Sequence, residues 1–287
     1  MDPSSSTSLS DWKLDVRFED GKRYHDMPEG THCWEQVERL GEGTCGEVWK
    51  EQCLSDNFSS SSVFRAVKHI DKRRGRWTHT SKREIKALTT FSDNNVVEVS
   101  LEATRYRRDF QGAAGEPKEP EAASITGQIA QALLYMHSKN FIHRDLKPLN
   151  ILVSHPGPAW HVKVADFGLT RDLSDGITGT HQIGTNGYMA PEMWDTSQSY
   201  TSAIDVWALG AITFCMLAGS PPFLNPMTLP DYRKDPTLFP TSRLRSSTEP
   251  CRGFITGAMA ANPEERLTVE EALKHYWLSK SKNTVCR

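Results

Sequence analysis

The sequence lacks the cysteine pattern of a disulfide or zinc protein. None of its six cysteines forms a C-x-x-C pair, the spacing that often marks a metal or redox site; they stand at positions 33, 45, 53, 215, 251 and 286. Scattered cysteines of this kind are typical of reduced thiols. We therefore expect a cytoplasmic or nuclear protein without disulfides.

Long apolar segments and a strong excess of one charge are also missing. The longest apolar run, residues 206–219, is shorter than the about 20 residues that a membrane-spanning helix needs, so we predict a buried core helix there. The polar start of the chain has no apolar segment of the signal-peptide type. A formal net charge of −2 gives no general attraction to nucleic acid or to an acidic membrane surface. We expect neither as a partner.

The chain length of 287 residues allows one large hydrophobic core or two smaller ones. Residues 1–33 are polar, Ser-rich at the start and without clear periodicity, which predicts a flexible N-terminal extension. Residues 279–287 are expected to form a C-terminal tail.

The strongest functional signal is a short polar loop at residues 143–150, His-Arg-Asp-Leu-Lys-Pro-Leu-Asn. The apolar residues on its two sides are typical of short buried strands. A loop held at both ends can position polar groups rigidly. Asp145 would accept the proton of an attacking hydroxyl, Lys147 would offset charge on a transferring phosphoryl group, and Asn150 would bind a divalent metal. The alternative is a loop of satisfied polar residues without chemistry.

A second carboxylate follows in Asp166-Phe167-Gly168, after the strand-like residues 161–164. A three-residue motif alone is weak, but its distance from the polar loop is informative. Together the two motifs resemble the catalytic loop and the Asp-Phe-Gly motif of eukaryotic protein kinases. The resemblance implies an α+β, two-lobed kinase domain at residues 34–278. It would have a small, mainly antiparallel β N-lobe with one main helix (about 34–115) and a larger, mainly helical C-lobe (about 120–278).

Residues 40–48 form a G-x-G-x-x-G-x-V pattern between two strand-like segments, 34–40 and 47–51. Glycines let the backbone approach phosphates closely, although this pattern alone often marks a simple turn. A dinucleotide fold would need a helix directly after the glycines, whereas the chain continues as strand. The kinase resemblance therefore implies that this hairpin covers the phosphates of ATP, through Leu40, Gly41, Glu42, Gly43, Thr44, Cys45, Gly46, Glu47 and Val48.

Ala66-Val67-Lys68, in the strand-like segment 63–70, resembles the family's third strand. Lys68 would contact the α- and β-phosphates, and Glu84, on a helix-like segment at 81–88, would be its ion-pair partner. The alternative for each is an ordinary exposed charge. The resemblance adds Ala66, Leu152 and Asp166 to the residues expected around ATP, and it makes Asn150 and Asp166 the ligands of Mg²⁺.

Residues 99–120 depart from the family's pattern. In kinases this interval carries two strands, a hinge that binds adenine and a short helix, which need on the order of 25 to 30 residues. Here no apolar strand is followed by an acidic hinge, and much of the segment is Gly, Pro and charge. A deletion, divergence or a wrongly joined coding sequence would each explain the departure.

The activation segment, residues 166–192, ends in Ala-Pro-Glu at the family's usual distance. We expect Thr178 or Thr180 to be phosphorylated by an upstream kinase, with Arg144 beside the phosphate. By resemblance, Thr185 bonds the catalytic Asp and the loop Lys, which is typical of Ser/Thr kinases.

Three further residues are expected to support the C-lobe. Asp205 would accept hydrogen bonds from the catalytic-loop backbone, and Arg266 would pair with Glu192 as a buried bridge. The apolar spacing at 120–139 predicts a long helix that precedes the loop, and residues 272–278 resemble the family's final helix, with His275 as a packing residue.

These features favour a monomeric Ser/Thr protein kinase that uses ATP and Mg²⁺ and acts on Ser or Thr hydroxyls of proteins. Its catalytic residues would be Asp145, Lys147, Asn150 and Thr185. One alternative is a catalytically impaired kinase-like binding module, because of residues 99–120. Another is a small-molecule phosphotransferase. The Ala-Pro-Glu motif and the long activation segment argue against it, because together they resemble a docking platform for a protein substrate.

Overall fold

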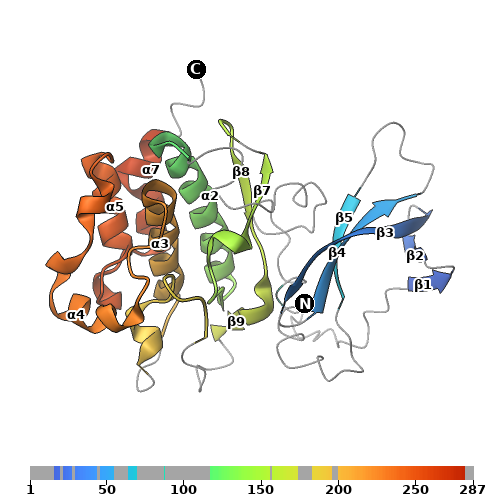
Figure 1. Cartoon of the computed structure of the whole chain (residues 1–287), viewed down its shortest axis with the longest axis horizontal. Helices are drawn as coiled ribbons and strands as arrows, with labels where there is room; N and C mark the ends of the chain where they lie inside the picture. The colour runs from blue at the N-terminus through green and yellow to red at the C-terminus, as the bar shows by residue number, and fades with distance from the viewer. Residues whose placement is uncertain are drawn as a thin grey trace, which may run out of the picture. The chain divides into compact units, whose positions relative to one another are not determined.

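The computed structural model of the chain describes residues 16–19, 22–27, 30–43, 46–54, 64–69, 87, 117–155, 157–173, 183–195 and 200–281. The chain divides into two compact units (Figure 1). Residues 1–71 and 99–104 belong to the first unit, and residues 72–98 and 105–287 belong to the second. Several predicted features lie outside the described residues: positions 99–116, Thr44, Cys45, Glu84, Thr178 and Thr180. Of the predicted helix at 81–88, only Ala87 is described, and it is helical and buried.

The first unit contains an antiparallel sheet of five strands in the order β1-β2-β3-β4-β5. The strands span Val16–Glu19, Lys22–Met27, Gly30–Gly43, Gly46–Cys53 and Phe64–His69. The strands predicted at 34–40 and 47–51 are confirmed as parts of β3 and β4, and the strand predicted at 63–70 is confirmed over 64–69, which is β5.

Strands β1 and β2 lie where the sequence predicts a flexible extension, so the structure differs from that expectation over residues 16–33. Val16 to Glu19 alternate apolar and polar residues, but charged and polar residues dominate the rest of this stretch and leave no apolar alternation there. In β2, backbone pairing forms the strand instead, because β2 lies antiparallel to β3, with Tyr24 opposite Cys33. Such pairing depends on the neighbouring strand and is not encoded in a local apolar pattern.

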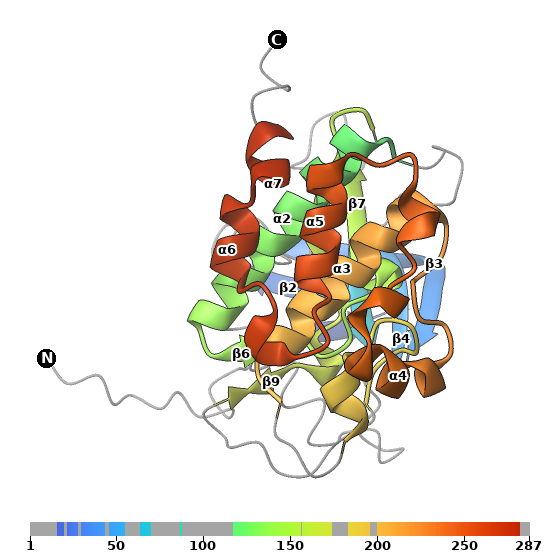
Figure 2. The same cartoon turned by 90° about the vertical axis from the view of Figure 1, so that its left-hand side faces the viewer.

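The second unit is mainly helical, and short strands precede and follow its functional loops (Figures 1 and 2). Its helices are α2 (Glu119–Ser138), α3 (Ala203–Ala218), α4 (Leu229–Lys234), α5 (Glu249–Ala258), α6 (Val269–Lys274) and α7 (Tyr276–Ser281). Its strands are β6 (Phe141–Ile142), β7 (Ile151–His155), β8 (His161–Val164) and β9 (Arg171–Asp172). Helix α3 packs against both α2 and α5. No helix among the described residues is both long and apolar enough to cross a bilayer.

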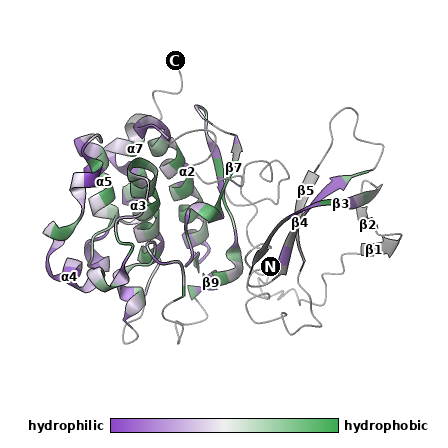
Figure 3. Cartoon of the chain, in the orientation of Figure 1, coloured by the Kyte–Doolittle hydropathy of each residue, from purple (hydrophilic) through white to green (hydrophobic). Residues whose placement is uncertain are grey.

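Helix α3 forms the centre of the hydrophobic core of this unit. It is apolar along most of its length (Figure 3) and buried on nearly all sides, as expected for a helix without a polar face. It ends at Gly219, whose φ of 77° lies in the left-handed region that favours glycine. The prediction of a buried helix at 206–219 is therefore confirmed.

Helix α2 presents one apolar face to this core, as its residue spacing predicts. Its fully buried side chains include Ile125, Ile129, Leu133 and Met136. The hydroxyls of Thr126 and Thr213 form a buried hydrogen bond of 3.0 Å, which joins α2 to α3. These two helices are the rigid elements on which the polar loop is mounted.

The C-terminal part of the unit confirms two expectations and corrects one. Arg266 forms a buried ion pair with Glu192, and His275 packs its ring edge-on against Phe254. The single helix predicted over 272–278 is wrong, because the chain breaks at His275, whose extended backbone (ψ 137°) separates α6 from α7.

Candidate active site

The polar loop at 143–150 is held at both ends by short two-stranded sheets. β6 pairs with β9 before the loop, and β7 pairs with β8 after it, which confirms the strands predicted at 141–142, 151–153 and 161–164. Inside the loop, the Leu146 side chain is buried. A single 3₁₀ turn, η3 (Pro148–Asn150), leads into β7. The loop is therefore held in place by the backbone pairing of its flanking strands and by the buried side chain of Leu146. Such anchoring keeps the polar groups of the loop in fixed positions, which positional catalysis requires.

A buried carboxylate in the first turn of α3 holds the start of the loop. Asp205 accepts hydrogen bonds from the backbone N–H groups of His143 (2.9 Å to Oδ2) and Arg144 (3.0 Å to Oδ1). Arg144 has a φ of 73°, a left-handed conformation that is unfavourable for a residue with a side chain. The two bonds to Asp205 stabilise this bend, as expected for Asp205 from the sequence.

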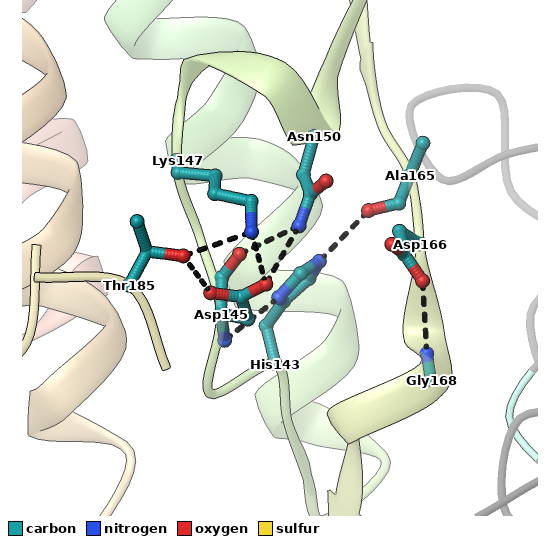
Figure 4. A network of polar contacts seen from close by, with 8 residues as sticks. All are labelled: His143, Asp145, Lys147, Asn150, Ala165, Asp166, Gly168 and Thr185. Carbon is teal, nitrogen blue, oxygen red and sulfur yellow. Dashed lines mark hydrogen bonds and ion pairs between the residues drawn. The ribbon is translucent and has the colours of Figure 1, made fainter. Parts of the chain in front are cut away.

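Asp145, Lys147 and Thr185 form a closed triangle of hydrogen bonds (Figure 4). The Thr185 hydroxyl donates to Asp145 Oδ1 over 2.7 Å. Lys147 Nζ donates to Asp145 Oδ2 over 2.6 Å and to Thr185 Oγ1 over 2.8 Å. The structure thus brings together three of the predicted catalytic residues, although Thr185 is 40 residues from Asp145 in the chain.

Asn150 contacts Asp145 of this triangle, and Asp166 follows Ala165, the backbone partner of Asn150. The Asn150 amide donates from Nδ2 to the Asp145 backbone oxygen (2.8 Å) and to Asp145 Oδ2 (3.3 Å), which orients its Oδ1 away from Asp145. The Ala165 N–H donates to the Asn150 carbonyl over 2.8 Å and so places Asp166 alongside (Figure 4). Asp166 has a φ of 63°, and its Oδ1 accepts the Gly168 N–H over 3.3 Å.

The chemistry of these two side chains fits a magnesium ion. Mg²⁺ prefers oxygen ligands, and beside a phosphorylated substrate it generally uses one or two protein carboxylates and leaves the other positions to phosphate and water. The amide oxygen of Asn150 and the carboxylate of Asp166 are donors of this kind. The orientation of the Asn150 amide by Asp145 supports this fit.

His143 joins the loop to the Asp-Phe-Gly segment, a role that the sequence did not reveal. Its Nδ1 accepts the Asp145 N–H over 3.3 Å, so the ring proton is on Nε2, which donates to the Ala165 carbonyl over 3.0 Å. The ring is fully buried and packs at 5.7 Å from Phe167. The backbones that carry Asp145 and Asp166 are thereby coupled.

The Asp205 carboxylate has a pKa below the ordinary value, although it is buried. Burial acts to raise the pKa, but the hydrogen bond from His137, the electrostatic influence of the His137 and His143 rings and the Arg144 N–H act to lower it. His137, at the end of α2, contacts Asp205 directly, with 2.9 Å between Nε2 and Oδ2. Nothing in the local sequence distinguishes this histidine, because its partner is 68 residues away.

The residues predicted to surround ATP are divided between the two units. In the first unit, Leu40–Gly43 and Gly46–Val48 are the facing ends of β3 and β4, with Gly43 opposite Gly46. Lys68 on β5 lies opposite Val48, and Ala66 lies opposite Lys50. The Glu47 carboxylate accepts bonds from Arg39 (2.9 Å) and Trp49 (3.1 Å). In the second unit, Leu152 lies on β7 beside the polar loop.

Residues 183–195, in the second half of the activation segment, pack against α3 and the loop after it. Gly187 has a φ of 89°, and a Cβ at this position would lie 2.8 Å from the Pro221 ring. The Arg144 side chain is buried, with its guanidinium 5.5 Å from the centre of the Tyr200 ring. The position of Arg144 beside a phosphorylated threonine stays a prediction.

The chain was compared with known proteins. The family described as protein kinase domain matches residues 34–278. Calcium/calmodulin-dependent protein kinase type 1B from Homo sapiens is 36% identical over 272 residues, which cover 86% of this chain and 75% of that protein. Calcium/calmodulin-dependent protein kinase type 1 from Caenorhabditis elegans is 30% identical over 258 residues, 84% of this chain and 72% of that protein.

A protein from a third organism is also similar to this chain and is named as a serine/threonine kinase. The probable serine/threonine-protein kinase fhkC from Dictyostelium discoideum is 30% identical over 239 residues, which cover 75% of this chain and 40% of that protein. None of these relatives favours the alternative of a kinase-like binding module. The chain belongs to the protein kinase family and is a protein kinase of the serine/threonine type.

Proposed function

We propose that the chain is a catalytically competent kinase that transfers the γ-phosphoryl group of ATP to Ser or Thr hydroxyls of protein substrates. The observation that carries this proposal is the hydrogen-bonded triangle of Asp145, Lys147 and Thr185. A carboxylate with both oxygens held by neighbours is positioned to bind one further hydroxyl in a defined direction. Phosphoryl transfer depends mainly on such positioning and on electrostatics.

Asp145 is assigned to orient the acceptor hydroxyl and to accept its proton. Thr185 holds one of its oxygens, whereas Lys147 and Asn150 hold the other. Lys147 is assigned a second role: its ammonium group, 2.6 Å from Asp145, would offset the negative charge that moves toward the acceptor. The hydroxyl of Thr185 supports the assignment to Ser and Thr acceptors, since it occupies the position expected in kinases of that type.

Asn150 and Asp166 would hold Mg²⁺, which when bound offsets the charge of the ATP phosphates. For ATP itself we propose the residues of the β3–β4 hairpin from Leu40 to Val48, with Lys68 at the phosphates and Glu84 as its partner. Ala66 and Leu152 would contact the nucleotide through their apolar side chains. The kinase pattern supports each of these assignments, and the strand register of the first unit supports those on β3, β4 and β5.

Regulation by an upstream kinase belongs to the same proposal. Phosphate on Thr178 or Thr180 would add about −1.5 to −2 charge, which favours pairing with an arginine such as Arg144. A monomeric chain is sufficient for the reaction, because the polar loop, its support and the predicted ATP-binding residues all belong to one polypeptide.

The test is phosphate transfer from Mg-ATP to a generic basic protein by the unmodified chain and by Asp145→Asn. The substitution keeps the size of the side chain but removes its negative charge, and we expect a loss of at least about a hundredfold in kcat. Asp235→Asn is the matched control, because Asp235 is an exposed aspartate whose side chain bonds to Thr237 in its own turn. Equal activity of Asp145→Asn and the unmodified chain would refute the assignment of the base.

Binding of nucleotide is a separate requirement and is measured separately. A thermal shift with Mg-ATP is expected for the unmodified chain and for Asp145→Asn, since the substitution leaves the predicted phosphate contacts in place. Absence of the shift together with absence of transfer would show that the chain is the kinase-like binding module instead.

A further inference from the structure

A third donor reaches the carboxylate that holds the catalytic loop. Asp205 accepts the N–H groups of His143 and Arg144, and its Oδ2 also lies 2.9 Å from His137 Nε2. We propose that His137 is a positioning residue for phosphoryl transfer, which acts through Asp205 on the backbone before Asp145. The inference rests on the proposed function and adds a residue to it.

The two partners lie at the ends of two helices. His137 is in the last turn of α2, and Asp205 is in the first turn of α3. A negative group such as the Asp205 carboxylate is favoured near a helix N-terminus. Because α2 and α3 pack together in the core, the contact joins two rigid elements rather than two mobile surface chains.

The His137–Asp205 contact is buried, so loss of the His137 donor would be costly for the Asp205 carboxylate. The side chain of Asp205 is 1% exposed and that of His137 is 13% exposed. A buried carboxylate is costly unless donors satisfy its oxygens. Without His137, Oδ2 would keep one donor, the His143 N–H, and the carboxylate would be freer to rotate or to take up water.

Rotation of this carboxylate would be transmitted directly to the reacting group. Its two backbone partners, His143 and Arg144, immediately precede Asp145. Arg144 has an unfavourable φ of 73° that needs support from its surroundings. A displacement of about 1 Å at a catalytic group can cost a hundredfold in rate, so a loosened Asp205 would lower kcat without touching the predicted ATP-binding residues.

Three substitutions separate positioning from bulk stability. His137→Gln keeps an N–H donor at a similar reach from the backbone, whereas His137→Asn has its amide one methylene closer to the helix and falls short of Asp205. His137→Leu removes the donor. His155→Leu is the matched control, because His155 is an exposed histidine on β7. Each variant is assayed for kcat, for KM of Mg-ATP and for thermal unfolding.

We expect His137→Leu and His137→Asn to lower kcat by about tenfold to a hundredfold, with KM for Mg-ATP changed by less than about twofold. His137→Gln should keep kcat within about threefold of the unmodified chain, and His155→Leu should leave it unchanged. Rescue by Gln is the decisive readout, because an amide restores the donor but not the shape of the imidazole ring.

Two results would overturn the inference. One is an unchanged kcat in His137→Asn, which tests the contact even where the Leu variant does not fold. The other is a kcat in His137→Gln as low as in His137→Asn. If the unmodified chain transfers no phosphate, the proposed function itself fails and this inference fails with it, which is a distinguishable outcome.

Discussion

Removal of the Arg266 guanidinium should strongly destabilise the second unit. Arg266 donates from Nη1 and Nη2 to the two oxygens of Glu192, over 2.6 and 3.0 Å. It also donates to the carbonyls of Ala203 (2.9 Å) and Ala260 (3.0 Å), and its guanidinium lies 5.2 Å from the centre of the Trp207 ring. Arg266→Ala would thus leave a buried carboxylate and two carbonyls without these donors.

The expected loss of stability in Arg266→Ala follows from the burial of the ion pair. The side chains of Arg266 and Glu192 are 0% and 3% exposed. Loss of one partner of a buried ion pair costs about 3–5 kcal/mol, because the remaining charge is uncompensated. A change of 1 kcal/mol shifts the melting temperature of a domain of 150–250 residues by about 2–4 °C. We therefore expect Arg266→Ala to lower the melting temperature by roughly 6–20 °C.

A double substitution tests whether the uncompensated charge is the cause. Arg266→Met with Glu192→Gln removes both charges, and this pair should lose less stability than the sum of the two single variants. Thermal unfolding followed by circular dichroism, with urea unfolding as a second probe, measures the unmodified chain, Arg266→Ala, the two single variants Arg266→Met and Glu192→Gln, and the double variant. A shift below about 2 °C for Arg266→Ala, or strict additivity of the two single effects, would refute the reasoning.

Three more outcomes follow from the site and its support. Thr185→Ala should lower kcat by about tenfold or more, because the catalytic carboxylate loses a donor, whereas Thr185→Ser should retain most activity, as measured by peptide phosphorylation. The lowered pKa of Asp205 means that its ionised form favours folding. That contribution should be present above the unfolded pKa, about 4, and should be lost as the pH falls through the lower folded pKa, so Asp205→Asn should flatten the acid limb of the stability curve. Gly187→Ala should lower the melting temperature, because the new Cβ would meet Pro221 and φ is positive.

Matched controls accompany these variants. Gly253→Ala on α5 places its Cβ in open space, with no atom within 4 Å, and should not destabilise the protein. Asp231→Asn on α4 is the control for the acid limb, since Asp231 is an exposed aspartate on the surface of the same unit. If the stability of Asp205→Asn falls at low pH as steeply as that of the unmodified chain, the expectation for Asp205 is wrong. If Thr185→Ala and Thr185→Ser lose activity equally, the expectation for the Thr185 hydroxyl is wrong.

The sequence by itself determined the local elements that mount the site. The helical spacing at 120–139 identified the buried face of α2, and the apolar run at 206–219 identified the core helix α3. Short apolar runs on both sides of the polar loop identified β6 and β7. These patterns are readable because burial of one face imposes a period of 3.6 on a helix and selects apolar residues for a buried strand. The roles of Thr185, Arg266 and Asp205 came from the kinase resemblance, since no local pattern encodes a distant partner.

Only the tertiary structure decided which polar groups meet. His137 and Asp205 are 68 residues apart, and His143 joins the Ala165 backbone across 22 residues. Periodicity shows that a helix face is buried, but the partner of a side chain on that face depends on how α2 and α3 pack. Strand β2 shows the same limit, because it forms through backbone pairing with β1 and β3 rather than through an apolar pattern of its own.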